Sequence, residues 1–239
     1  MAQPSESASI ARSYSPGVSV VSQISSDNER SEPRWPAAVA FLAVGGLRLA
    51  LPSRLSVGPS WILLLTVASL LIPTIWARQR NFHTLNTVLG YVIIAIVTAD
   101  MVLSLYRLIA AIPSHTQRPA DMLRSAAALW LTNVTVFASW YWRLDAGGPR
   151  QRELRGSHVD GAFLFPQMIL NPQARHDMGE ESWSPGFIDY LFLAFGASTA
   201  FSPTDTPVLS HWAKLMMMLQ ALVSFTIVVV LAARAVGIL

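Results

Sequence analysis

Runs of apolar residues long enough to cross a lipid bilayer recur along the chain, and they constrain its fold more than any other feature. A helix needs about 20 apolar residues to cross the hydrocarbon core, and about 17 are enough when its polar ends reach the interface. Five runs reach that length: Trp35–Leu51, Ser60–Ala77, Leu85–Ile112, Met122–Trp142 and Trp212–Val236. A sixth apolar run, Phe187–Phe201, is shorter. The sequence therefore predicts an all-α fold, a polytopic transmembrane helical bundle with five or six hydrophobic helices.

The composition agrees with a membrane environment and excludes several classes of function. Of the 239 residues, 52% are apolar and only 13% are charged, which is too apolar for an ordinary soluble domain. The 17 basic and 14 acidic residues are scattered along the chain, so no basic surface for nucleic acid is expected. The chain has no cysteine, which excludes disulfides and thiolate chemistry. Membrane lipids are the expected surroundings.

The polar segments divide the chain into four parts. Residues 1–34 are rich in Ser, Pro and charged residues and have no apolar run of signal-peptide length, which predicts a disordered N-terminal tail. Residues 35–144 contain four predicted transmembrane helices, and 145–185 form a predicted polar loop. Residues 186–239 form the C-terminal part, in which a short apolar run, a polar break and a long apolar run follow one another.

The C-terminal part carries a family resemblance. Asp189–Phe192 matches the aromatic-rich opening of a pore helix, Thr199 matches a filter threonine, and Asp205 matches the acid that follows a filter. On these residues, the segment 186–239 resembles the pore module of the potassium-channel superfamily. The resemblance implies a homotetramer in a bacterial inner membrane, with the last helix around a central axis and monovalent cations as possible ligands. The predicted pore loop comprises Thr199, Ala200, Phe201, Ser202, Pro203, Thr204 and Asp205.

The central residues of the potassium filter are missing from this loop. Potassium selectivity depends on backbone carbonyls aimed down the pore, and the glycines of the T-V-G-Y-G motif allow the dihedral angles that aim them. Here Phe201 and Ser202 precede Pro203, which fixes its own φ and restricts the residue before it. We therefore expect a channel-like protein that is not potassium-selective by the usual filter. A non-conducting scaffold or accessory protein with a pore-like fold is an alternative, with residues 202–205 as an ordinary capped turn.

The membrane topology depends on the short run Phe187–Phe201. If it crosses, both termini share one side, and Arg78, Arg80 and the cluster Arg143–Arg155 lie together in the cytoplasm, as positive-inside bias favours. If it is a re-entrant pore helix that enters from outside, five spans place that cluster outside. The charge rule opposes this second arrangement. Six hydrophobic segments are slightly favoured, but the sequence leaves open whether all six cross.

Polar residues within the apolar runs are candidate sites. Asp100, Ser104 and Arg107 are spaced to share one helix face. An acid within a membrane span is costly, so Asp100 is either an ion or proton site of a proton-coupled transporter or the partner of Arg48, Arg107 or Asn133 in helix packing. Gln220 and Ser224 share a face of the last helix, toward a pore or a neighbour. The intramembrane polar candidates are Asp100, Ser104, Arg107, Asn133, Gln220 and Ser224.

No enzyme motif is present in the sequence. The five histidines lack ligand spacing such as H-E-x-x-H, and neither G-x-S-x-G nor a glycine-rich phosphate loop occurs. His158 with Asp160, and His176 with Asp177, are most simply solvated loop residues. No catalytic residue, metal or cofactor is therefore expected.

Overall fold

The structure is a computed structural model that describes residues 32–49, 59–110, 119–155, 160–181, 183–202 and 205–236. The chain divides into two units, Met1–Glu32 and Pro33–Leu239. All the helices below belong to the second unit. The predicted tail, residues 1–34, lies almost wholly outside the described residues.

Every regular element in the described residues is a helix, which confirms the all-α prediction. The long helices are α2 (Trp35–Leu49), α3 (Trp61–Gln79), α4 (His83–Ala110), α5 (Pro119–Leu144) and α10 (His211–Val236). The shorter ones are η2 (Asp145–Gly147), α6 (Pro149–Arg155), α7 (Pro166–Ile169), α8 (Pro172–Asp177) and α9 (Phe187–Thr199).

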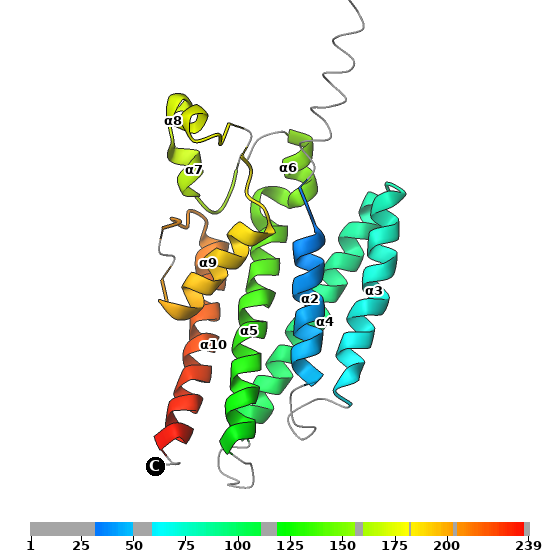
Figure 1. The fold of residues 1–239 in the computed structure, drawn as a ribbon, viewed down its shortest axis with the longest axis vertical. Helices are drawn as coiled ribbons and strands as arrows, with labels where there is room; N and C mark the ends of the chain where they lie inside the picture. The colour runs from blue at the N-terminus through cyan, green and yellow to red at the C-terminus, as the bar shows by residue number, and fades with distance from the viewer. Residues whose placement is uncertain are drawn as a thin grey trace, which may run out of the picture. The chain divides into compact units, whose positions relative to one another are not determined.

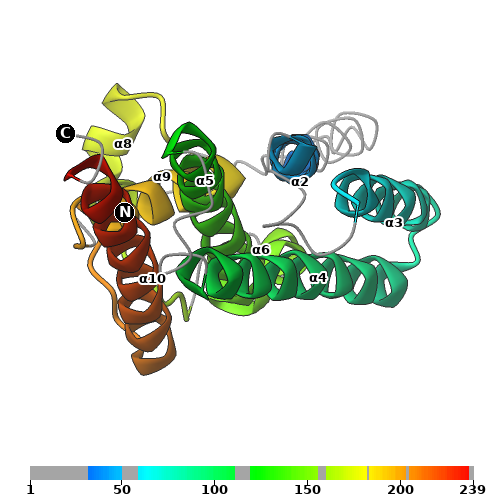
Figure 2. The ribbon, with the colours of Figure 1, turned by 90° about the horizontal axis from the view of Figure 1, so that it is seen from below.

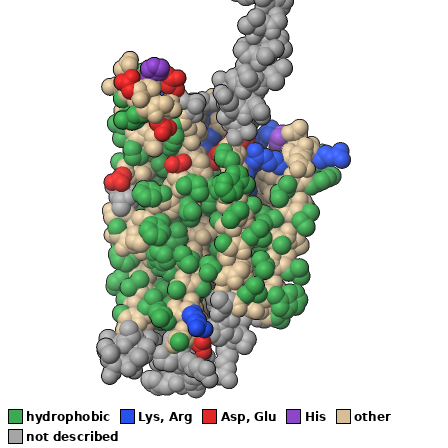
Figure 3. Space-filling view, in the orientation of Figure 1, with side chains coloured by type: hydrophobic (Ala, Val, Ile, Leu, Met, Phe, Trp, Pro, Cys, Tyr) green, Lys and Arg blue, Asp and Glu red, His purple; other side chains and the backbone are tan. Residues whose placement is uncertain are grey.

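Three of the described helices are long and apolar enough to cross a membrane: α3, α4 and residues His211–Ala233 of α10. Their exposed positions are occupied by large apolar side chains such as Leu65, Ile72 and Leu222, and Figure 3 shows apolar side chains covering the face between the charged ends. Such a surface is stable in lipid and costly in water. The chain is therefore a membrane-embedded protein.

Two apolar helices are too short to count as spans by length. The 15 residues of α2 and the 13 residues of α9 correspond to about 20 Å of helix, against about 30 Å of bilayer core. The 26 residues of α5 are long enough, but its sequence is more polar because it includes Asp121, Arg124 and Asn133.

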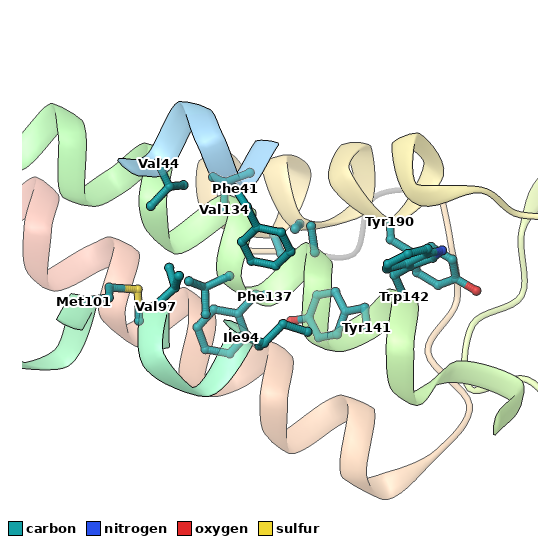
Figure 4. Packing of buried hydrophobic residues seen from close by; sticks show 14 of the residues in the cluster. Phe41, Val44, Ile94, Val97, Met101, Val134, Phe137, Tyr141, Trp142 and Tyr190 are labelled. Atoms are coloured by element: carbon teal, nitrogen blue, oxygen red, sulfur yellow. The ribbon is translucent and has the colours of Figure 1, made fainter. Parts of the chain in front are cut away.

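Helix α5 is the central element of the bundle. It packs against α2, α4, α9 and α10, while α3 packs against α2 and α4 (Figures 1 and 2). The core between α2, α4, α5 and α9 is filled by large apolar side chains (Figure 4), among them Phe41, Val97, Phe137 and Tyr141. Because lipid tails are as apolar as these side chains, the core is stabilised in a membrane by close van der Waals packing rather than by removal of surface from water.

Helix α9 begins beside the C-terminal end of α5 and ends near the middle of the bundle. At its start, the rings of Phe187 and Trp142 are in edge-to-face contact, 5.5 Å between centroids. Near its end, Ser198 contacts Asn133 and Gln220, which lie near the middle of α5 and α10. Figure 1 shows α9 running obliquely from the end of α5 toward the middle of the bundle.

Helix α10 begins at the same end of α5 as α9 does. Leu209, just before α10, donates from its backbone N to Ala162 O (2.8 Å), and Ala162 N donates to the carboxylate of Asp145, which directly follows α5. The chain therefore runs along α9 to the middle of the bundle and returns to the end at which α9 begins.

Part of the predicted polar loop at 145–185 is folded against these helices. An isolated antiparallel bridge joins Phe163 to Val208, and the Phe163 ring lies in edge contact with Tyr141, Tyr190 and Trp212. Phe163 and Phe165 are buried. The apolar residues of this loop therefore close the end of the bundle at which α9 and α10 begin.

The contact between α2 and α3 depends on the absence of a side chain at Gly45. A Cβ at this position would lie 2.9 Å from Leu64 Cα, whereas one at Gly46 would meet nothing within 4 Å. We expect Gly45→Ala to lower the free energy of unfolding by about 1–3 kcal/mol through overpacking. Gly46→Ala, the matched control, should be neutral or slightly stabilising, since alanine favours a helix by about 0.5–1 kcal/mol over glycine. Tryptophan-monitored thermal unfolding in detergent measures both, and equal midpoints would contradict the expected packing.

Candidate functional site

Gln220 of α10 holds α9 in place with three buried hydrogen bonds. Its Nε2 donates to Ala194 O (2.7 Å) and to Ser198 Oγ (2.8 Å), both on α9. Its Oε1 accepts from the hydroxyl of Tyr141 on α5 (2.6 Å). The side chain is fully buried, and its amide has both protons and its carbonyl engaged. One residue thus joins three helices.

Ser224, one turn further along α10, extends this network. Its Oγ donates to Ser198 O (2.7 Å) and accepts from Trp130 Nε1 on α5 (2.9 Å). Asn133 completes the cluster more loosely, with its Nδ2 3.4 Å from Gln220 O and 3.5 Å from Ser198 Oγ. Gln220, Ser224 and Asn133 are all buried. These three predicted candidates are therefore brought together, and they face α9 rather than an open axis.

The start of α9 is capped by its own sequence. The carboxylate of Asp189 accepts a hydrogen bond from Gly186 N (2.7 Å), which satisfies one of the free N–H groups at this helix end and places a negative charge near the positive end of the helix dipole. Asp189 belongs to the segment that matches the opening of a pore helix. In this structure it acts on its own helix terminus.

A second buried cluster, which the sequence did not predict, fixes α9 to the end of α5. Asp145 is fully buried and accepts from the hydroxyl of Tyr190 on α9 (2.6 Å). Arg152 of α6 donates through Nη1 to Trp142 O (3.0 Å) and to Asp145 O (2.9 Å). Its guanidinium also lies over the Tyr190 ring, 5.3 Å from the centroid. The sequence analysis placed Asp145 and Arg152 in the predicted polar loop. The one sequence signal for a buried site was an acidic residue shortly after the aromatic cluster Trp140–Trp142.

The described residues of the predicted pore loop lie at the end of α9 and just after it, and they are exposed. Thr199–Ser202 are exposed, as is Asp205, while Pro203 and Thr204 lie outside the described residues. Thr199 Oγ1 donates to Phe195 O within the helix (2.9 Å). Phe201 follows the helix with φ of +54°, a left-handed conformation that costs a non-glycine residue about 1–2 kcal/mol. Its ring lies against Phe225 of α10, 5.9 Å between centroids.

The other predicted polar residues lie on a different side of α5. Asp100 of α4 forms an ion pair with Arg48 of α2, one of the three partners considered from the sequence. Ser104 is buried, and among the described residues its hydroxyl has no hydrogen-bond partner. Arg48, Asp100, Ser104 and Thr132 line one small pocket between α2, α4 and α5, and Arg107 is not part of its lining. The pocket is separate from the cluster around Gln220.

Neither cluster resembles a metal site. Among the described residues, no group of three His, Asp or Glu side chains lies close enough to hold a metal ion. The polar groups around Gln220 are neutral, and each helix contributes to them. Their arrangement positions the short helix α9. The exposed segment that follows α9 is the candidate ligand-binding segment.

The Gln220 network predicts a specific loss of stability. Gln220→Met keeps a similar volume but leaves Tyr141 Oη and Ser198 Oγ without this partner, and we expect it to lower the free energy of unfolding by about 1–3 kcal/mol. The control is Thr226→Val, because the exposed Thr226 Oγ1 donates only to Leu222 O of its own helix (2.8 Å). Equilibrium unfolding in mixed micelles compares the two variants. An equally small effect of both would contradict the role given to Gln220.

The Arg48–Asp100 pair predicts a compensating double variant. Asp100→Asn leaves the buried Arg48 without its counter-charge, and removal of one partner of such a pair costs about 3–5 kcal/mol. Replacement of both residues, by Arg48→Met with Asp100→Leu, should recover most of that loss, since no unpaired charge remains. The same unfolding measurement applies. A double variant as unstable as Asp100→Asn alone would show that the pair is not what stabilises this pocket.

Comparisons with known proteins do not add a family to this description. No protein-family model, no curated protein and no solved structure matches the chain. The geometry around α9 is therefore the basis for a functional proposal.

Proposed function

We propose that this protein is a channel-like membrane protein of the bacterial inner membrane, in which several copies surround an aqueous path lined by residues 199–205 and α10. The proposal combines the likeness of residues 186–239 to a potassium-channel pore module with one observation. That observation is the exposed non-helical backbone that follows α9 at mid-depth. The proposed oligomer is a homotetramer, as the resemblance implies.

Residues Ala200–Ser202 follow α9 as exposed, non-helical chain, in which Ala200 N donates to Gly196 O (2.9 Å). In lipid, backbone groups there that have no partner carry a cost that only an assembly or water removes. Ser198 hydrogen-bonds near the middle of α5 and α10, so the residues that follow it lie at the depth of the hydrocarbon core if α5 and α10 cross. Lipid offers no hydrogen bonds, and irregular backbone at that depth is tolerated only where it is buried in protein or lines a water-filled cavity. In one copy of the chain these residues are exposed. A second copy and an aqueous path together would satisfy them.

The chemistry of this segment favours cations without potassium selectivity. It offers the hydroxyls of Thr199 and Ser202 and the carboxylate of Asp205, and acidic groups at a pore mouth attract cations. Phe201 stands where the resemblance would place a carbonyl of the filter. Its ring lies on Phe225, so it would narrow the path with an apolar surface.

In the proposed topology, α3, α4, α5 and α10 cross, α2 crosses as part of the longer apolar run Trp35–Leu51, and α9 re-enters. Most described arginines lie at the end where α9 begins, including Arg78, Arg80, Arg143, Arg150 and Arg155, and Figure 3 shows basic side chains gathered there. The positive-inside rule places this end in the cytoplasm. Helix α9 would then enter from the cytoplasm, opposite to the outside entry that the resemblance suggests.

The absence of cysteine from the sequence makes the path testable with single cysteines. We expect Thr199→Cys and Ser202→Cys, in spheroplasts and inverted vesicles, to react with a membrane-impermeant thiol reagent from the cytoplasmic side. The control is Ile72→Cys on α3, which is 70% exposed but faces lipid in this proposal and should stay unreactive. Labelling of Thr199→Cys from the outer side would reverse the topology. No labelling from either side would contradict an aqueous path.

Conduction is tested with the same variants in planar bilayers and liposomes. We expect a cation current that falls when Thr199→Cys is modified, and lower cation-over-anion selectivity in Asp205→Asn. Absence of current under all cation gradients would favour the non-conducting scaffold. Proton-coupled uptake that is unaffected by modification at residue 199 but lost in a folded Asp100 variant would favour the transporter.

A further inference from the structure

Arg143, the penultimate residue of α5, places its guanidinium between two aromatic rings and a glycine of α4, away from the cluster around Gln220. The Cζ atom lies 5.6 Å from the centroid of the Tyr91 ring and 5.5 Å from that of Trp142. The group occupies space that Gly90 of α4 leaves open, because a Cβ at Gly90 would lie 1.8 Å from Nη2 and 2.1 Å from Cζ. Tyr91 Oη also donates to Arg143 O (3.3 Å). The two helices thus form a seat for one cation.

No carboxylate among the described residues pairs with Arg143, and its buried Nε has no hydrogen-bond partner there. Glu153 is engaged by Arg34, whose Nη2 donates to it at 3.0 Å. Arg34 also donates through Nη1 to Asn86 Oδ1 (3.0 Å) and repels Arg143 electrostatically. Glu153 therefore pairs with Arg34 and not with Arg143, which leaves an excess positive charge in a partly buried place. An anion that binds there would compensate this charge.

The surroundings of Arg143 indicate which anion fits. Arginine binds phosphate oxygens with two parallel N–H donors. The residue lies at the arginine-rich end of the bundle, the end that the positive-inside rule assigns to the cytoplasmic headgroups in the proposed topology.

We infer that Arg143, with Arg34 beside it, forms a binding site for the phosphate group of an anionic phospholipid, seated between α4 and the end of α5. The lipid headgroup supplies the missing negative charge. Anionic lipids are attracted to basic segments at the cytoplasmic surface. Binding therefore depends on Arg143 in particular, and not on the summed charge of all the arginines at this end of the bundle.

Native mass spectrometry of the full chain in detergent, titrated with phosphatidylglycerol or phosphatidylcholine, tests the site. We expect the unmodified protein to retain phosphatidylglycerol more tightly than phosphatidylcholine. Arg143→Gln should weaken retention of phosphatidylglycerol about tenfold, in line with loss of a charge-assisted hydrogen bond. The matched control is Arg155→Gln, which removes the same charge from an exposed position on α6 and should change retention less than twofold.

Gly90→Ala provides a second test that leaves the charge in place. The added methyl group displaces the guanidinium from its seat, so phosphatidylglycerol retention should fall as in Arg143→Gln. Gly46→Ala, which adds a methyl group into open space on α2, should retain the lipid. Because Gly90→Ala keeps Arg143, it also answers the question if Arg143→Gln does not fold.

Several outcomes would overturn the inference. Equal loss in Arg155→Gln and Arg143→Gln would show that only diffuse charge attracts the lipid. Unchanged retention in Gly90→Ala would show that the seat over Gly90 is not used. Inorganic phosphate alone, if it displaced phosphatidylglycerol at low millimolar concentration, would identify a site for a soluble ion instead.

Discussion

The hydrogen bonds of Gln220 are the interaction on which the arrangement of the C-terminal half depends. A helix of 13 residues cannot span the hydrocarbon core, so α9 cannot be held by length and hydropathy as α3 and α4 are. It is held by side-chain bonds from α10 and α5, in a place where water cannot replace them. The cluster of Asp145, Arg152 and Tyr190 fixes the other end of the same helix. Between them, these two clusters fix both ends of α9 against α5 and α10.

Three arginines at helix contacts, Arg48, Arg152 and Arg143, are accommodated in three different ways. Arg48 is neutralised by Asp100 across two helices. Arg152 is surrounded by backbone carbonyls and an aromatic ring beside Asp145. Arg143 has aromatic rings and a glycine but no carboxylate among the described residues. In the first two arrangements the partners of the arginine come from the chain itself, and the role of the arginine is to stabilise the fold. The third is incomplete, which is why it points to a ligand.

The sequence predicted most of the long helices because their signal is local. The run Ser60–Ala77 became α3 (Trp61–Gln79), and Leu85–Ile112 became α4 (His83–Ala110), each within a few residues. Where the segment Phe187–Phe201 ends within the bundle was not predictable, because its position depends on hydrogen bonds to residues 22 to 65 positions away. For the same reason the residues of the Gln220 cluster were found one by one but not as a cluster. Asp145 and Arg152 were missed because their burial depends on a loop, 160–165, that folds back over them. The likeness to a potassium-channel pore module, the tetramer and the transport of ions remain predictions.

The position of Gln220 late in the chain has a consequence for how the protein is made. Helix α9 leaves the ribosome before α10, and its bonding partner arrives only when residue 220 has been synthesised. Until then the segment 187–199 lacks the length to remain across the bilayer, and the C-terminal end of α9 has contacts with α5, through Trp130 and Asn133, but not yet with α10. The hydrogen bonds that complete the docking of α9 therefore form late in biogenesis, after the synthesis of residues 220 and 224.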